Sequence, residues 1–308
     1  GETHQQAGRY DQAITDLTAA LEHDPTLAWA LASRGRTHHH AGRHDQAIAD
    51  LTAALELDPT LTWARSHLGD THRQAGRYDQ AIAEYTTALE LEPSYAWALA
   101  GRGETHQQAG RYDQAITDLT AALEHDPTLA WALAGRGRTH HHAGRHDQAI
   151  ADLTAALELD PTYAWAHATR VQVQRQAGRR EAARRDLERA LEAHPEDVSC
   201  TFERLMFEAV EGRLQSSAEQ WIQRRSSQAD PTDTETSFLN LLRSLFIETE
   251  NRVPEATEKL LAAFQGRGDL ADVLSYVVEL SALTGELGDR AQQCRDLIME
   301  HNPDVGRP

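Results

Sequence analysis

Histidine, which often binds metal ions or transfers protons, occurs in two runs of three in this sequence. The runs are 38–40 and 140–142. Successive residues of a helix point about 100° apart, so three neighbours cannot bind one ion, and ligands on a helix need a spacing of three or four residues. His40 and His44 have that spacing, but Gly42 interrupts the helix between them. Because no cysteine or carboxylate cluster completes a site, we expect no metal and no other cofactor.

Catalytic motifs are also absent from the sequence. It contains no glycine-rich phosphate-binding loop, no G-x-S-x-G and no H-E-x-x-H. Serine, histidine and aspartate are common, but they stand at positions that recur along the chain, whereas an active site is normally unique. We therefore predict that the chain is not an enzyme.

Tryptophan shows the most regular spacing of any residue type. Five tryptophans follow one another at intervals of 34 residues, and prolines and glycines keep the same interval. A fixed period of this size indicates an array of stacked structural units. The tryptophans are Trp29, Trp63, Trp97, Trp131 and Trp165, the prolines Pro25, Pro59, Pro93, Pro127, Pro161 and Pro195, and the glycines Gly8, Gly42, Gly76, Gly110, Gly144 and Gly178.

Within one unit the apolar residues recur at helical spacing. In residues 28–61, one stripe of apolar residues follows a glycine and ends at Asp58-Pro59. This pattern predicts two antiparallel helices per unit, here 28–41 and 45–57. The members of the stripe are Ala47, Ile48, Leu51, Ala54 and Leu55.

Six such units occupy residues 1–197, and the first lacks half of its first helix. The full units are 28–61, 62–95, 96–129, 130–163 and 164–197. Residues 1–60 and 103–162 differ only at Ser33, which is Gly135 in the second copy. We infer that a block of three units was duplicated recently, so any surface that binds a partner is expected to occur twice.

The unit resembles the tetratricopeptide repeat (TPR). That pattern has a small residue at position 8, glycine near 15, an aromatic residue at 17, alanines at 20 and 27, and proline at 32. The second unit departs from it at positions 4, 7 and 11, and its tryptophan stands at position 2. The matching residues are Gly35, Gly42, His44, Ala47, Ala54 and Pro59, and the departures are Leu31, Arg34 and His38. The resemblance implies an all-α fold, a right-handed α-solenoid of TPR helix-turn-helix units.

The resemblance also implies a binding surface. In the family, the first helix of each unit lines a concave groove through positions 2, 5, 9, 12 and 13, which share one helix face. Here position 2 is tryptophan, position 5 is small, and positions 9, 12 and 13 are polar. The residues implied to bind a partner are Trp29, Trp63, Trp97, Trp131, Trp165, Arg36, Asp70, Glu104, Arg138, His39, His40, Arg73, His141 and His142.

An alternative role for the tryptophans is structural. They could pack between neighbouring first helices, beside the arginines at position 7, namely Arg34, Arg102, Arg136 and Arg170. We expect those arginines to pair with acids at position 23 such as Asp50 or Asp152. The histidines at position 11, His4, His38, His72, His106 and His140, are expected to fill the core with one satisfied N–H.

Composition narrows the function further. The net charge of −18 argues against a nucleic-acid partner, because binding phosphates needs clustered Lys and Arg. No apolar run approaches membrane-spanning length, and no signal peptide is visible. Cys200 and Cys294 lie far apart, which fits a reducing compartment, and we expect a cytoplasmic location.

Beyond residue 197 the repeat pattern weakens. Apolar periodicity still predicts helices over 198–211, 214–225, 235–251, 254–264, 269–284 and 289–301. We interpret 198–308 as about three degenerate TPR-like helical pairs that cap the solenoid, since terminal units need a different outer face. A separate small helical domain is the alternative.

These observations predict a non-enzymatic protein-interaction module that binds a peptide or protein in its groove. Lysine at position 5 and asparagine at position 9, which clamp C-terminal carboxylates in some family members, are absent. Near-identical blocks rich in Arg and Ala resemble the C-terminal arrays of bacterial multidomain (STAND-type) signalling proteins. There an effector or NTPase domain precedes a ligand-sensing array, and we expect this chain to be part of a longer protein. The alternative is a structural scaffold that self-assembles through the repeats.

Overall fold

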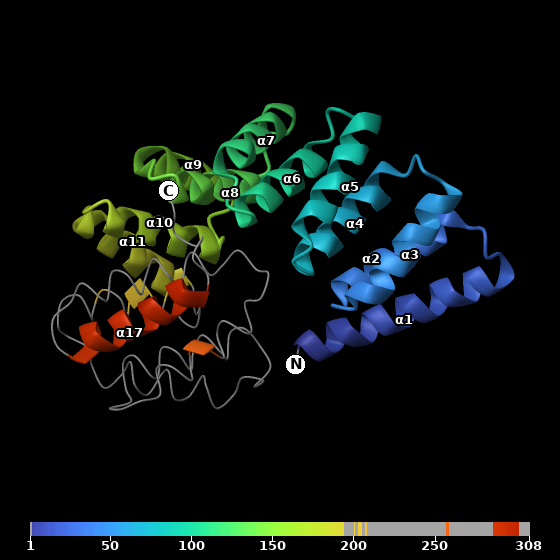
Figure 1. Cartoon of the computed structure of the whole chain (residues 1–308), viewed down its shortest axis with the longest axis horizontal. Coiled ribbons are helices and arrows are strands. Elements are labelled where there is room, and N and C mark those ends of the chain that lie inside the picture. Colours follow the sequence, from blue (N-terminus) through green and yellow to red (C-terminus); the bar gives the residue numbers. More distant parts are fainter. Residues whose placement is uncertain are drawn as a thin grey trace. The chain divides into compact units, whose positions relative to one another are not determined.

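The computed structural model describes residues 2–193, 200, 203–204, 207, 257–258 and 286–301, with side chains in the first helix from residue 9 onward. The predicted all-α fold is confirmed, because every element among these residues is a helix (Figure 1). None of these helices is long and apolar enough to cross a membrane. The helices are α1 (Glu2–His23), α2 (Ala28–His40), α3 (His44–Leu57), α4 (Thr62–Gln74), α5 (Tyr78–Leu91), α6 (Ala96–Gln108), α7 (Tyr112–His125), α8 (Ala130–His142), α9 (His146–Leu159), α10 (Ala164–Gln176), α11 (Arg180–Ala193) and α17 (Glu286–His301).

The turn inside each helical pair depends on a glycine in the left-handed region. Gly42 has φ +71°, its N–H donates to the His39 carbonyl at 2.9 Å, and the Arg43 N–H donates to the His38 carbonyl at 2.9 Å. These bonds cap the last carbonyls of α2, and a residue with a Cβ would be strained at this φ. The same conformation recurs at Gly76, Gly110, Gly144 and Gly178.

The link between successive pairs is a short polar turn. Asp58 Oδ1 accepts hydrogen bonds from the Thr60 N–H at 3.0 Å and from the Thr60 hydroxyl at 2.6 Å. These bonds lower the pKa of Asp58, because they favour the charged carboxylate. Pro59 has no N–H to donate to the helix, so the proline and the Asp58–Thr60 hydrogen bonds both favour the end of α3 at this point. The same turn forms at Asp24, Asp126 and Asp160.

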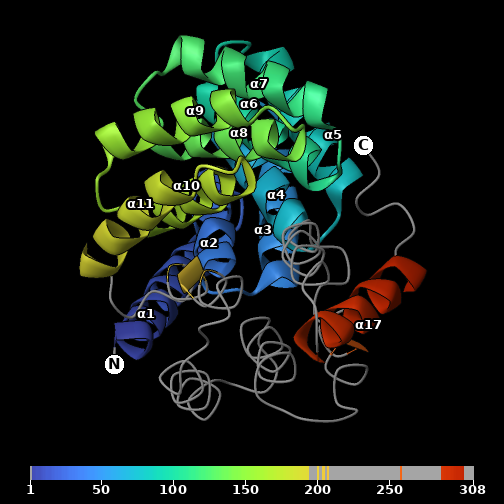
Figure 2. The same ribbon diagram turned by 90° about the vertical axis from the view of Figure 1, so that its left-hand side faces the viewer.

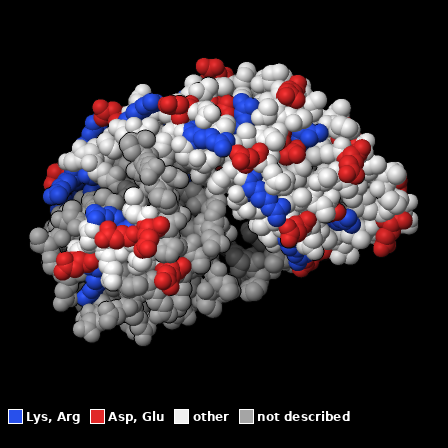
Figure 3. Space-filling model, viewed as in Figure 1, with Lys and Arg blue, Asp and Glu red and all other residues white. Residues whose placement is uncertain are grey.

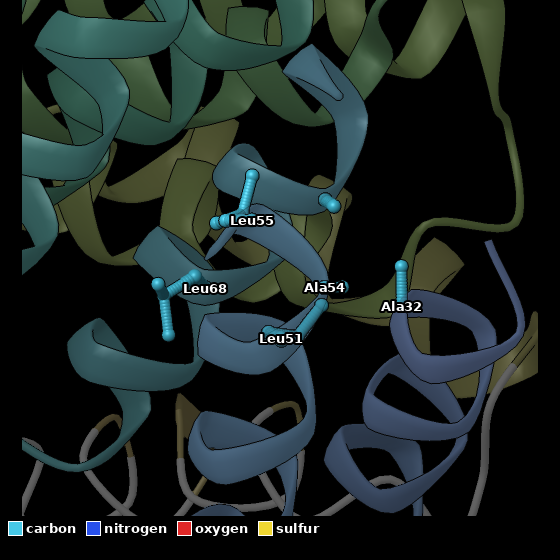
Figure 4. Packing of buried hydrophobic residues seen from close by; sticks show 6 residues of the cluster. Ala32, Leu51, Ala54, Leu55 and Leu68 are labelled. Carbon is cyan, nitrogen blue, oxygen red and sulfur yellow. The ribbon is translucent and has the colours of Figure 1, made fainter. Parts of the chain in front are cut away.

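The chain forms two compact units, Gly1–Gln148 and Ala149–Pro308. In the first, α1 to α8 stack in chain order, each helix against the next, which confirms the predicted solenoid of helical pairs (Figures 1 and 2). Figure 4 shows one layer of its core, where Ala32 of α2, Leu51, Ala54 and Leu55 of α3, and Leu68 of α4 meet. All five are buried, so each hairpin is held to the next by small and branched aliphatic side chains.

The second compact unit contains α10, α11 and α17. Val171, Ala183, Leu187 and Phe207 form one buried cluster in it. Of the helices predicted beyond residue 197, the one at 289–301 corresponds to α17. Residues 200, 203, 204 and 207 of the predicted helix 198–211, and 257 and 258 of the predicted helix 254–264, are helical, and the rest of these predictions lies outside the described residues.

The first helix differs from the sequence prediction. Residues 2–23 and 104–125 are identical, yet the later copy turns at Gly110 while Gly8 lies inside a continuous α1. In the later copy the turn is anchored by residues 96–103, which extend α6, and by Arg111, which pairs with Asp79 at 2.9 Å. A continuous helix satisfies the backbone hydrogen-bonding groups on both sides of Gly8.

Candidate functional site

The first helices of neighbouring pairs form a continuous surface in residues 1–148. Helix α2 contacts α4, α4 contacts α6, and α6 contacts α8, whereas α3, α5 and α7 make no comparable contacts with one another. The helices that approach one another lie on the inner side of the curved stack. We call the surface formed by α2, α4, α6 and α8 the inner face.

The five periodic tryptophans are only partly buried. Trp29 is 56% exposed and Trp97 is 42% exposed. Trp63 and Trp131 are half-buried and pack with one side against core clusters. In the other compact unit, Trp165 is half-buried with its ring centroid 5.8 Å from that of Tyr163. The rings therefore combine packing with accessible surface, and their binding role stays a prediction.

Position 9 of one unit contacts the tryptophan of the next unit. The Arg36 guanidinium carbon lies 5.6 Å from the centre of the Trp63 ring, a cation–π distance. One unit later the Trp97 Nε1–H donates to Asp70 Oδ2 at 3.3 Å. In both cases position 9 of one unit and position 2 of the next are 27 residues apart, so the repeat brings the same two positions together in successive units.

Position 12 of one unit contacts position 9 of the next. Arg73 Nη1 lies 3.3 Å from Glu104 Oε2, and Arg138 Nη2 donates to Gln107 Oε1 at 2.6 Å. The structure thus brings the predicted residues at positions 2, 9 and 12 together between neighbouring helices. Gln107 was not among the predicted site residues.

Asp70 is the centre of a polar network in the unit 62–95. This buried carboxylate accepts a hydrogen bond from the Tyr85 hydroxyl at 2.6 Å, and it lies 3.5 Å from Arg73 Nη2 and 3.7 Å from His67 Nδ1. Burial, and then the negative charge of Asp70, raise the pKa of Tyr85 well above its usual value, so the hydroxyl keeps its proton. Asp70 also holds the Trp97 N–H, so the network fixes the orientation of an exposed indole.

Tyr85 is a residue that the sequence prediction missed. It stands where the other units have Leu51, Leu119 and Leu153, and all four side chains are fully buried. A departure from an otherwise repeated leucine, together with the aspartate at position 9, was the available signal. The unit 62–95 is therefore the only full unit with a tyrosine at this core position.

The arginines at position 7 make the ion pairs that the sequence predicts. Arg34 binds Asp50 through two bonds of 2.7 Å, and Arg102 binds Asp118 in the same way. In the unit 62–95 this position is Leu68, and the arginine is three residues earlier. There Arg65 pairs with Glu84 at 3.0 Å. These arginines are structural.

The histidines divide into core and surface residues. The position-11 side chains His38, His72 and His106 are buried, as predicted, but their Nδ1 atoms have no hydrogen-bond partner. His39 and His141, predicted to contact a partner, are also buried. His40 is exposed and His142 is half-buried. No group of His, Cys, Asp or Glu in the described part of the chain could hold a metal ion.

We expect the buried His39 to make stability depend on pH. Its Nδ1 lies 3.0 Å from the Thr71 hydroxyl, and burial is the main cause that lowers its pKa to about 4. An unfolded histidine titrates near 6.5, so acidification from there toward 4 protonates the unfolded chain first and removes stability. We expect a lower Tm at pH 5 than at pH 7. In thermal unfolding followed by circular dichroism, the difference in Tm between pH 5 and pH 7 should be smaller for His39→Gln than for the parent. Glutamine is chosen because Gln107 occupies the equivalent position in the unit 96–129. An equal or larger difference would contradict this origin.

Comparisons with known proteins agree with the repeat architecture. A family model described as "TPR repeat" matches residues 69–110. Models described as "Tetratricopeptide repeat" match residues 1–61, 101–164 and 140–199. Together these matches cover more than half of the chain. No curated protein matches the sequence significantly.

Solved structures show a similar fold at low identity. PilW, titled a widely conserved type IV pilus biogenesis factor, has a TM-score of 0.59 and 19% identity, covering 65% of this chain and 93% of that one. The structure of the Cut9-Hcn1 hetero-tetramer has a TM-score of 0.58 and 21% identity. The match covers 64% of this chain and 39% of that one. MamA (residues 41-end) from Desulfovibrio magneticus RS-1 has a TM-score of 0.50 and 17% identity. The match covers 56% of this chain and 97% of that one. At these identities the likeness concerns the fold alone.

Proposed function

The chain belongs to the tetratricopeptide repeat family, and from that premise we propose that it binds a peptide or protein segment on its inner face. The observation that carries the proposal is Trp97. Its ring is 42% exposed, while its N–H is bonded to Asp70 and its ring centroid lies 5.1 Å from that of Trp131. An exposed indole held in one orientation is a good anchor for a partner, because little conformational freedom is lost on binding.

The surroundings of Trp97 support binding over catalysis. Asp70 and Arg73 are engaged with each other and with Tyr85, Trp97 and Glu104, so they hold the surface around the indole in place. On the side seen in Figure 3, positive and negative side chains alternate over the described helices without gathering into a basic patch. We therefore propose a protein partner and not a nucleic acid or a membrane.

Residues at positions 9, 12 and 13 complete the proposed surface. Arg36 and His40 are exposed, and Glu104, Arg138, Arg73 and His142 are partly exposed, so they can contact a partner. His39, His141 and Asp70 are buried and would act by holding their neighbours. We propose that the array is the ligand-sensing part of a larger bacterial signalling protein in the cytoplasm, with an effector or NTPase domain before it.

Trp97→Ala tests the binding role. We expect affinity for the partner to fall about 30-fold, as for other interface anchors. Stability should fall by less than the roughly 3–5 kcal/mol that a fully buried tryptophan contributes, because part of this ring is already in water. Partners would be captured with the wild-type chain, identified by mass spectrometry and measured by calorimetry.

Leu57→Ala is the matched control. Leu57 is 47% exposed at the end of α3, away from the inner face, so its loss should leave affinity unchanged. Equal binding by wild type and Trp97→Ala would disprove the proposal. Light scattering over a concentration series separates it from self-assembly, since a binding module stays monomeric without its partner.

A further inference from the structure

Two tryptophan sites on the inner face differ in the charge beside them. Arg36 lies over the Trp63 ring and fills that site with a cation of the chain itself. Two units later, at the same spacing of 27 residues, the residue that corresponds to Arg36 is Glu104 and the ring is Trp131. Glu104 extends toward α8, where its Oε1 lies 3.7 Å from the point at which a Cβ on Gly135 would stand. The later site therefore has a carboxylate where the earlier one has a guanidinium.

Trp97 and Trp131 form a pair of rings at this later site. Their centroids lie 5.1 Å apart with 59° between the ring planes. Since the Trp97 N–H is used by Asp70, what this indole offers to a partner is ring surface. The negative face of an indole attracts cations, and arginine is the side chain that most often occupies such a site.

Two carboxylates beside the ring pair share one arginine. Arg73 Nη2 lies 3.5 Å from Asp70 Oδ1, and Arg73 Nη1 lies 3.3 Å from Glu104 Oε2. His67, 3.7 Å from Asp70, stays neutral because burial lowers its pKa. The whole chain has a net charge of −18, which attracts basic partners from a distance.

We infer that the Trp97–Trp131 pair binds the cationic side chain of a basic peptide segment, with an arginine or lysine stacked on the rings beside Glu104. This inference rests on the proposed function and names the chemistry of its ligand. The proposed function requires only that the inner face bind a segment; the inference adds that the segment carry a positive charge at this point.

The experiment uses three pools of fluorescein-labelled heptapeptides. Each pool has a fixed central residue, arginine, glutamine or glutamate, and mixed neutral residues elsewhere. Fluorescence anisotropy measures binding to the whole chain, and circular dichroism checks that each variant is folded. We expect the arginine pool to bind best and to lose affinity on the order of tenfold with Glu104→Arg, because the new guanidinium occupies the rings as Arg36 does at Trp63.

A matched variant separates the site from the overall charge. Glu124→Arg makes the same change on the exposed side of α7 and should leave binding of the arginine pool nearly unchanged. Equal losses in the two variants would overturn the inference, because attraction would then come from net charge alone. If Glu104→Arg does not fold, Glu104→Gln replaces it; Gln172 occupies the equivalent position in the unit 164–197.

The pools also distinguish the two levels of the proposal. If the glutamine or glutamate pool binds as well as the arginine pool, and Trp97→Ala abolishes that binding, the inner face binds peptides but the inferred charge preference is wrong. If no pool shows binding that depends on Trp97, both the proposed function and the inference fail. Preference for arginine that depends on both Trp97 and Glu104 supports both.

Discussion

Tyr85→Leu is expected to lower the free energy of unfolding by about 3 kcal/mol or more, although leucine is the residue that the other units carry there. Tyr85 is fully buried, and its ring fills the space beside Gly69 and Gly101, where an added Cβ would lie 2.9 Å and 2.7 Å from ring atoms. A leucine in the same place leaves a cavity beside two glycines. The change also removes the hydroxyl that donates to Asp70 at 2.6 Å, so a buried carboxylate loses its shortest hydrogen bond.

Denaturant unfolding measures this loss of free energy, and Tyr85→Phe separates the contribution of the hydrogen bond from that of the ring. Phenylalanine keeps the ring and removes only the hydrogen bond, for which about 1.5–3 kcal/mol is expected because the acceptor is charged. The difference between the two variants then gives the contribution of the ring. A Tyr85→Leu protein as stable as the parent would show that the unit 62–95 tolerates the common residue, and that the Tyr85–Asp70 pair is not needed for folding.

The repeat period made most of the fold predictable. Helices predicted at 28–41 and 45–57 are found at Ala28–His40 and His44–Leu57, because a glycine and an Asp-Pro pair end them by local rules that need no knowledge of the neighbours. The Arg34–Asp50 pair and the buried His38 were predictable for the same reason. Each of these features depends on a single helical pair.

Features that depend on a departure from the repeat, or on which residues pack nearby, were less predictable. Asp70 was expected to face a ligand, yet it is buried and bonded to Tyr85 and Trp97, which lie on the next two helices. The hydroxyl that binds it comes from position 24, where the other full units have leucine. The continuous α1 is a second case, because its sequence also forms the α6–α7 turn when residues 96–103 precede it. Packing partners, and not local propensity, decide both outcomes.

Gly101→Ala and Gly135→Ala are expected to change stability in opposite directions, although both glycines hold the same position in consecutive units. A Cβ on Gly101 would lie 2.7 Å from the Tyr85 ring, whose far side is enclosed by the core. The ring cannot move away without disturbing Asp70, so we expect a loss of about 1–3 kcal/mol, typical of overpacking.

At Gly135 the nearest atom to an added Cβ is 3.7 Å away, and alanine favours a helix interior by roughly 0.5–1 kcal/mol over glycine. Gly135→Ala should therefore stabilise the chain, and Ser33 at the matching place in the first copy of the duplicated block already carries a Cβ. Parallel urea titrations of the two variants measure both effects. Equal stabilisation by both alanines would mean that the Tyr85 ring is free to shift, and then the fixed orientation of Trp97 through Asp70, on which the binding proposal depends, would lose its physical basis.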